Sequence, residues 1–97
     1  MHIPDEKLAQ VVDRFEQIEA RMGATTDGDE IVQLGKDYAE LKPVAEGVRK
    51  LQDVRAEMAD LEEMASDPEM GAMARDELQA LKSSLPKLER EVSLLLL

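Results

Sequence analysis

Cysteine and tryptophan are absent from this 97-residue chain, and aromatic residues make up only 2% of it. Without cysteine, the chain cannot form a disulfide or use a thiolate as nucleophile or metal ligand. The core cannot be built on the two aromatic side chains, Phe15 and Tyr38, and must come from Leu, Val, Ile, Met and Ala. With few β-branched residues, this composition favours helix-on-helix packing over a β-sandwich. The length allows one domain at most.

Basic residues are also scarce: 12 Lys and Arg stand against 22 Asp and Glu, and the formal net charge is −10. Because nucleic-acid binding relies mainly on Lys and Arg at the phosphates, we expect no direct contact with RNA or DNA through this chain. No apolar stretch approaches the roughly 18 residues of a membrane span. The first six residues lack the basic and apolar regions of a signal peptide. We therefore expect a soluble cytoplasmic protein that makes no membrane contact.

Apolar residues recur in steps of three and four within three segments, the spacing that places them on one face of a helix. The first segment predicts a helix over about 4–22. Pro4 suits its first turn, and Gly23 suits the stop after its last turn. The apolar stripe of this helix consists of Leu8, Val11, Phe15, Ile18 and Met22.

The second segment predicts a long helix over about 28–65. Asp27 followed by Glu30 resembles a capping box, with Thr26 and Asp29 as an alternative register. Two consecutive three-residue steps interrupt the heptad phase of its stripe. The members of the stripe are Ile31, Leu34, Tyr38, Leu41, Ala45, Val48, Leu51, Val54, Met58, Leu61 and Ala65.

The third segment predicts a helix over about 68–96. Ser66 or Asp67 can cap it, and Pro68 fits its first turn. Its stripe alternates steps of four and three, which marks a helix that packs along a partner. The members of this stripe are Ala74, Leu78, Leu81, Leu85, Leu88, Val92 and Leu95.

Two prolines fall inside these predicted helices, where each forfeits a backbone hydrogen bond. No turn residues surround Pro43, so we expect a kink near Leu41–Pro43 and not a chain reversal. Pro86 leaves the neighbouring apolar residues in phase, which predicts a bend within one helix. We expect Ser83 and Ser84 to help satisfy the backbone groups that Pro86 leaves free.

The three segments together predict an all-α fold: an elongated antiparallel three-helix bundle, or helical hairpin, with coiled-coil character. A short connection makes the two long helices antiparallel neighbours, and the first, about half as long, should pack along one end of that pair. The chain closes on Leu94, Leu95, Leu96 and Leu97 without a helix stop signal. We therefore expect these residues to be a fragment of a longer protein.

No residue is predicted to be catalytic, cofactor-binding or metal-binding. His2, the only histidine, lies at an end that we expect to be frayed, and no cysteine or second histidine could complete a zinc site. A calcium loop starting at Asp27 needs an oxygen ligand at its fifth position and a glutamate at its twelfth, where Ile31 and Tyr38 stand. Helix capping explains these acids better. We expect no enzymatic activity and no cofactor.

Two other groups of residues have both a structural and a functional interpretation. The acidic group around the second connection is a docking patch for a basic partner or a solvated face, and we favour the solvated face. Its members are Asp60, Glu62, Glu63, Asp67 and Glu69. The methionines nearby form an adaptable groove or fill the core, and we favour the core. They are Met58, Met64, Met70 and Met73. No His or Lys is arranged to activate the hydroxyls of Ser83 and Ser84.

Several strings occur in order along the chain and carry a family resemblance. They are Lys7-Leu8, Arg14-Phe15-Glu16, Leu34-Gly35-Lys36-Asp37-Tyr38-Ala39-Glu40-Leu41 and Asp67-Pro68-Glu69-Met70-Gly71-Ala72-Met73-Ala74-Arg75-Asp76-Glu77-Leu78. With the closing leucines, they resemble the N-terminal domain of bacterial class I peptide chain release factors, and more closely the type that reads UAA and UAG. The last string is the most specific, and the resemblance spans nearly the whole chain.

The resemblance implies a part in translation termination. The family reads the stop codon through a Pro-x-Thr tripeptide and promotes hydrolysis of peptidyl-tRNA with a Gly-Gly-Gln loop. Neither motif occurs in these 97 residues, so no functional residue can be carried over. The implied role is that of an accessory docking domain. The implied partners are the factor-binding region of the large ribosomal subunit and a GTP-hydrolysing release factor.

A free-standing coiled-coil adaptor or oligomerisation module is the alternative from another class. It would use the same apolar stripes between chains, with the leucines 94–97 as a dimer contact. The intramolecular bundle instead predicts a monomer with at most weak self-association through those leucines.

Overall fold

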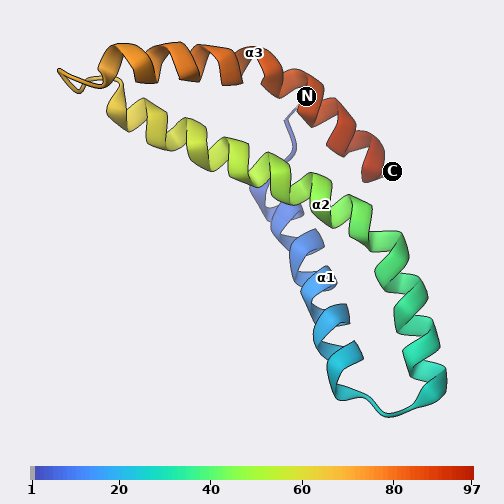
Figure 1. Ribbon diagram of the computed structural model, residues 1–97. Coiled ribbons are helices and arrows are strands. Elements are labelled where there is room, and N and C mark those ends of the chain that lie inside the picture. Colours follow the sequence, from blue (N-terminus) through green and yellow to red (C-terminus); the bar gives the residue numbers. More distant parts are fainter. Residues whose placement is uncertain (1) are drawn as a thin grey trace.

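The computed structural model describes residues 2–97, which form three α-helices and no strand (Figure 1). The helices are α1 (Asp5–Ala24), α2 (Gly28–Met64) and α3 (Gly71–Leu95). The molecule is elongated, with extents of 59 × 25 × 17 Å along its principal axes. The all-α, elongated fold predicted from the apolar stripes is confirmed. None of the helices within residues 2–97 is both long and apolar enough to cross a membrane.

α2 is the central helix, and the other two pack on different parts of it. α1 runs antiparallel along the first half of α2, whereas α3 runs antiparallel along the second half (Figure 1). Within residues 2–97, α1 and α3 do not pack along each other. The first helix therefore lies at one end of the long pair, as expected, but it packs on α2 alone. The molecule is two helical hairpins that share one long helix.

The two aromatic residues pack together between α1 and α2. The ring centroids of Phe15 and Tyr38 are 5.0 Å apart, and the ring planes are inclined by 24°. The guanidinium carbon of Arg49 lies 5.5 Å from the Phe15 centroid, and the ammonium of Lys42 lies 5.9 Å from that of Tyr38. Such stacked pairs add about 0.5–1.5 kcal/mol to the burial of their area. A chain with two aromatic residues thus uses both to close one hairpin.

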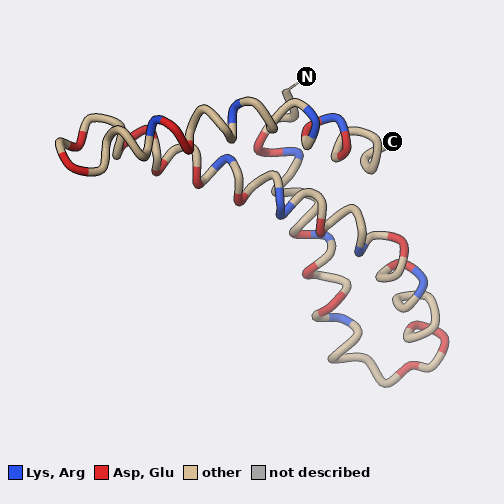
Figure 2. The backbone as a smooth tube through the Cα atoms, turned by 45° about the horizontal axis from the view of Figure 1, so that its top comes forward, with Lys and Arg blue, Asp and Glu red and all other residues tan. Residues whose placement is uncertain are grey.

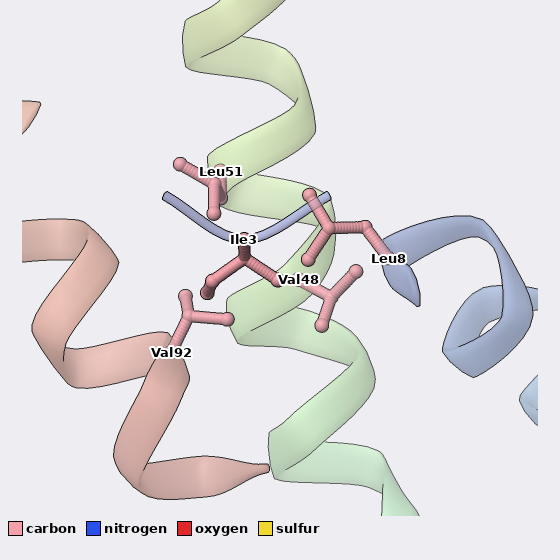
Figure 3. Close-up of a cluster of buried hydrophobic side chains, with 5 residues drawn as sticks. All are labelled: Ile3, Leu8, Val48, Leu51 and Val92. Carbon is pink, nitrogen blue, oxygen red and sulfur yellow. The ribbon is translucent and has the colours of Figure 1, made fainter. Parts of the chain in front are cut away.

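The buried side chains form two apolar clusters. The first, which we call the junction cluster, lies where α2 passes from one partner to the other and consists of Ile3, Leu8, Val48, Leu51 and Val92 (Figure 3). The second lies between α2 and α3 and consists of Leu61, Ala74 and Leu78. The consecutive three-residue steps of the α2 stripe fall at the junction cluster. The stripe changes phase there because α2 changes its packing partner.

Both internal prolines lie inside continuous helices, as predicted. α2 continues through Pro43 and α3 through Pro86. In Figure 1, α2 bends in its green part and α3 bends in its second half. The hydroxyls of Ser83 and Ser84 donate to the carbonyls of Gln79 and Leu81, at 3.0 and 3.1 Å. We expected these hydroxyls to satisfy the backbone group that Pro86 leaves free. That group is the carbonyl of Lys82, four residues before Pro86, and neither serine binds it, so the expectation was wrong.

The predicted boundaries differ from the observed ones at two connections. Gly23 does not stop α1, which continues to Ala24 and ends because Thr25 turns to an extended conformation. None of the described glycines has a positive φ. Residues 68–70 form a turn, so α3 begins at Gly71 and not at Pro68. The second helix begins at Gly28 as predicted, and the remaining helix ends differ from the predictions by one residue, the usual uncertainty of such boundaries.

Candidate functional site

The connection between α2 and α3 holds the string that carries most of the family resemblance. Asp67 caps the turn: its carboxylate accepts hydrogen bonds from the N–H groups of Met70 and Glu69, at 2.9 and 2.8 Å. These two N–H groups hold the pKa of Asp67 below its ordinary value, because they stabilise the charged carboxylate. Contrary to the prediction from the sequence, neither Ser66 nor Asp67 caps α3 itself: the N-cap of α3 is Met70, without a side-chain hydrogen bond, and Asp67 caps the turn that precedes the helix.

The turn closes around the carbonyl oxygen of Ala65, at the end of α2. One guanidinium nitrogen of Arg75 donates a hydrogen bond to it at 2.5 Å. A Cβ atom on Gly71 would lie 2.7 Å from the same oxygen and 3.1 Å from Arg75. Any larger residue at this position would push against backbone, so glycine permits the close approach of α3 to α2. Arg75 then satisfies a carbonyl that the end of α2 leaves without an intrahelical partner.

The rest of the same string anchors α3 on α2. Ala74 and Leu78 are buried against Leu61 in the second apolar cluster. Each chemically distinctive position of the string thus has a structural role: Asp67 caps, Gly71 gives space and Arg75 binds a carbonyl. The string that carries most of the family resemblance therefore builds the turn between α2 and α3.

The acidic group at this connection is exposed, as both interpretations of it predict. Its members Asp60, Glu62, Glu63, Asp67 and Glu69 are all solvent-accessible. Apart from Asp67, none of their carboxylates forms an ion pair or hydrogen bond within residues 2–97. Figure 2 shows acidic residues gathered at both turns of the molecule, with most basic residues between them. No group of three or more His, Asp or Glu residues in this part of the chain is placed to hold a metal ion.

The four methionines near the connection divide into two pairs. Met58 and Met64 pack against the second apolar cluster, as predicted for core residues. Met70 and Met73 are exposed, so the prediction was wrong for them. The cause is the late start of α3, because Met70 still belongs to the turn and Met73 lies on the outer face of the first helical turn.

The opposite turn, between α1 and α2, is also held by caps. Asp27 accepts hydrogen bonds from the N–H groups of Asp29 and Glu30, which confirms it as the N-cap of α2. Glu30 does not complete the capping box. Its carboxylate pairs with the guanidinium of Arg21, and the N–H of Asp27 donates instead to the hydroxyl of Thr25. The bond from Arg21 lowers the pKa of Glu30.

A charged network at the junction was not predicted from the sequence. Arg55 in α2 donates to Asp5 in α1 at 2.7 Å and to Glu89 in α3 at 3.4 Å. Glu89 is the one buried charged side chain among residues 2–97. The imidazole Nδ1 of His2 lies 3.9 Å from the same carboxylate. In place of the frayed end expected from the sequence, the N-terminal segment is seated here, with Ile3 only 7% exposed.

The sequence contains a faint signal for this network. Glu89 follows Leu85 by four residues and precedes Val92 by three, so it lies on the apolar face of α3. A single acid on such a face needs a buried cation, and Arg55 supplies it. Nothing in the sequence pattern identifies Arg55 as that cation.

The end of α3 carries exposed leucines. Leu94 and Leu97 are 69% and 98% exposed, and they line an open groove of about 360 Å³ together with Arg90 and Ser93. Leu95 is partly exposed as well, whereas Leu96 packs against the junction cluster.

Comparison with known proteins matches residues 11–97 to the PCRF domain. The chain is 58% identical over 96 residues to "Peptide chain release factor 1" of Caulobacter vibrioides, which covers 99% of this chain and 27% of that protein. It is 58% identical over 99 residues to the protein of the same name from Maricaulis maris, covering 100% of this chain and 28% of that protein. It is 48% identical over 95 residues to the protein of that name from Dinoroseobacter shibae, covering 98% of this chain and 27% of that protein. The chain thus spans little more than a quarter of these relatives. No solved structure matches it.

Replacing Gly71 with alanine should destabilise the fold by about 1–3 kcal/mol, because the added methyl group meets the Ala65 carbonyl. Gly35→Ala is the matched control. A Cβ there meets nothing within 4 Å, so this variant should gain roughly 0.5–1 kcal/mol from helix propensity. Urea unfolding followed by circular dichroism measures both. Equal stabilities of the two variants would show that the turn adjusts freely and that the close approach is unimportant.

The stabilisation by Asp67 should depend on pH. Its pKa is lowered in the folded state, so its contribution is complete above the unfolded pKa and is lost as the pH falls through the folded pKa. The free energies of unfolding of wild type and Asp67→Asn should therefore differ most near neutral pH and converge on acidification. Glu63→Gln removes an exposed acid without a hydrogen bond and serves as the control. A difference between wild type and Asp67→Asn that is constant with pH would contradict the assignment.

Proposed function

The chain belongs to the PCRF domain family, and on that premise we propose that it is an accessory docking domain of a translation termination factor. In this proposal, the domain has no catalytic residues, and the termination reaction is directed by other parts of a longer protein. The observation that carries the proposal is the match of residues 11–97 to the PCRF domain, with relatives that are named peptide chain release factor 1.

The surface of the molecule supports a docking role. The chain is long and narrow, its net charge is −10, and both turns present acids at the ends of the long axis. Such a surface suits a basic protein partner and is poorly suited to RNA. We propose the factor-binding region of the large ribosomal subunit as the partner, with a GTP-hydrolysing release factor as a second one. The domain itself makes no direct contact with nucleic acid in this proposal.

The exposed leucines at the end of α3 favour one alternative, an adaptor or oligomerisation module. Leu94 and Leu97 could form a contact between two chains. Against it, most of the stripe residues of α1, α2 and α3 are already covered within one molecule. The exposed apolar side chains are divided among the start of α2, the α2–α3 turn and the end of α3, and do not form one continuous face. A stable interface needs about 800 Å² from each partner, which this end does not offer. We therefore propose a monomer with at most weak self-association.

Deleting residues 1–97 from the full termination factor should leave codon-dependent peptide release largely intact. It should slow recycling or coupling to the GTP-hydrolysing factor, because only docking is removed. Single-turnover release from ribosomes programmed with a stop codon, and multiple-turnover release with the GTPase present, measure the two effects. The proposal is wrong if the deletion abolishes single-turnover release.

Two charge variants of the full factor refine this test. Glu62→Gln/Glu63→Gln removes exposed acids at the α2–α3 turn without touching a buried contact. Asp13→Asn/Glu19→Gln removes the same number of exposed acids from α1 and is the matched control. If only Glu62→Gln/Glu63→Gln weakens coupling to the GTP-hydrolysing factor, the contact lies at the α2–α3 turn. Equal behaviour of the two places the contact elsewhere on the domain.

Light scattering of the isolated chain tests the alternative. We expect the mass of a monomer, 10.8 kDa, at micromolar concentration. Leu94→Ser/Leu97→Ser should then leave the mass and the helix content unchanged, because neither side chain is buried. A stable dimer that this variant dissociates would favour the oligomerisation module over the docking domain.

A further inference from the structure

The two hairpins of the molecule share α2, and beyond this shared helix they contact each other at a single place. α1 and α3 do not pack along each other within residues 2–97. The groups that bring them together are the junction cluster and the Arg55 network, and both involve the N-terminal segment. In Figure 1, this segment passes between α2 and the last part of α3 before α1 begins. Its position makes it a mechanical link between the hairpins.

Ile3 fills the space between the helices at this place. Figure 3 shows its side chain among Val48 and Leu51 of α2, Val92 of α3 and Leu8 of α1. It is the only member of the junction cluster that lies outside the helices. With Ile3 removed, Val92 would lose an apolar neighbour that connects it to α1. An apolar side chain of this size contributes substantially to holding its neighbours together.

The segment is rigidly coupled to α1. Pro4 is extended, with φ −58° and ψ 141°, and its carbonyl accepts hydrogen bonds from the N–H groups of Lys7 and Leu8 at 3.1 and 3.3 Å. The proline ring fixes one of the two backbone angles between Ile3 and the helix. The first turn of α1 binds the Pro4 carbonyl, so Pro4 is fixed to α1 and Ile3 is tethered directly before it.

Arg55 makes the same connection through charge. It binds Asp5, the first residue of α1, and Glu89 of α3, while its own side chain is 17% exposed and that of Glu89 is 10% exposed. A carboxylate this deeply buried is stable only while it is paired. Separation of the end of α3 from α2 therefore requires that Glu89 reach water. The ionic link and the Ile3 contact open and close together.

The end of α3 has a built-in place at which it can separate. Pro86 interrupts the hydrogen-bond ladder of α3 directly before the segment that carries Glu89 and Val92. The first part of α3 is held by Ala74 and Leu78 in the second apolar cluster and by the turn at Gly71. The last part, from Leu85 through Leu88 to Val92, packs at the junction cluster. Gly47 of α2 lets this end approach closely, since a Cβ there would lie 2.6 Å from a methyl carbon of Leu95.

We propose that residues 2–4 form a strap that locks the end of α3, residues 87–95, onto α2 and thereby couples the two hairpins. With Ile3 seated, the hairpins form one rigid body. With Ile3 displaced, residues 87–95 separate from α2 by pivoting at Pro86, while the α2–α3 turn stays closed. The strap is a conformational device of the fold, and it does not depend on the docking role proposed above.

Hydrogen exchange tests the strap by region. Ile3→Ser should accelerate amide exchange in residues 87–95 by on the order of tenfold, the effect of losing one buried aliphatic side chain. Exchange in residues 71–82 should stay close to that of wild type. Ile31→Ser is the matched control, because Ile31 is 43% exposed and lies outside both clusters. The control should change exchange in neither region.

Two outcomes would overturn the strap. Equal acceleration in residues 71–82 and 87–95 would mean that Ile3 contributes only to global stability, and unchanged exchange would mean that the segment locks nothing. Ile3→Val keeps a smaller apolar side chain and should show a weaker effect with the same regional pattern. It also keeps the test decisive if Ile3→Ser does not fold. Arg55→Met should loosen residues 87–95 independently, by leaving Glu89 unpaired.

Spin-label distances test the coupling directly, because the chain has no cysteine of its own. Asp13→Cys with Glu91→Cys places labels on exposed positions of α1 and of the end of α3. Their distance distribution should be narrow in the otherwise wild-type chain and broad with Ile3→Ser. Glu57→Cys with Glu77→Cys reports on the hairpin of α2 and α3, and its distance distribution should not change with Ile3→Ser. A distribution across the strap that stays narrow in Ile3→Ser would overturn the proposal.

Discussion

The structure depends on one constraint: α2 has to hold two helices that do not hold each other. Its first half buries a face against α1 and its second half buries a face against α3. The junction cluster lies where these faces meet, and Leu8, Val48, Leu51 and Val92 are fully buried there. Burying each such side chain contributes about 1.5–3 kcal/mol. In so thin a molecule, these few residues supply a large share of the stabilisation.

The charged network at the junction costs solvation energy, and in return it fixes how α3 is positioned on α2. Placing Glu89 in an apolar surface costs solvation energy that Arg55 offsets only by pairing with it. An apolar pair of similar volume would hold the helices equally well. It would also tolerate a shift of α3 by one turn, whereas Arg55 can reach Asp5 and Glu89 together in one register only. Apolar stripes that repeat every heptad do not by themselves distinguish such registers.

The periodic part of the structure was predictable, and the aperiodic part was not. The stripes located three helices, and Asp27 was recognised as a cap because short-range hydrogen bonding follows from neighbouring residues. The buried position of Ile3 and the Arg55–Glu89 pair were not predicted, because these contacts join residues far apart in the chain. Gly71 lay inside the predicted helix over 68–96, and no role was assigned to it. Its need for space depends on the Ala65 carbonyl, which only the folded turn brings near.

The same distinction explains why the family could be assigned while no site could be built. The distinctive residues of the α2–α3 string build one turn: Asp67 accepts two N–H groups, Gly71 leaves room for the Ala65 carbonyl and Arg75 donates to that carbonyl. A string of this kind identifies an architecture, and a shared architecture does not specify chemistry. The proposed docking role therefore rests on membership of the family and on the exposed surface, and the geometry of this chain limits how that surface can be presented. Because α1 and α3 are fixed to one long helix, the two acidic turns are held at opposite ends of a molecule whose longest extent is 59 Å.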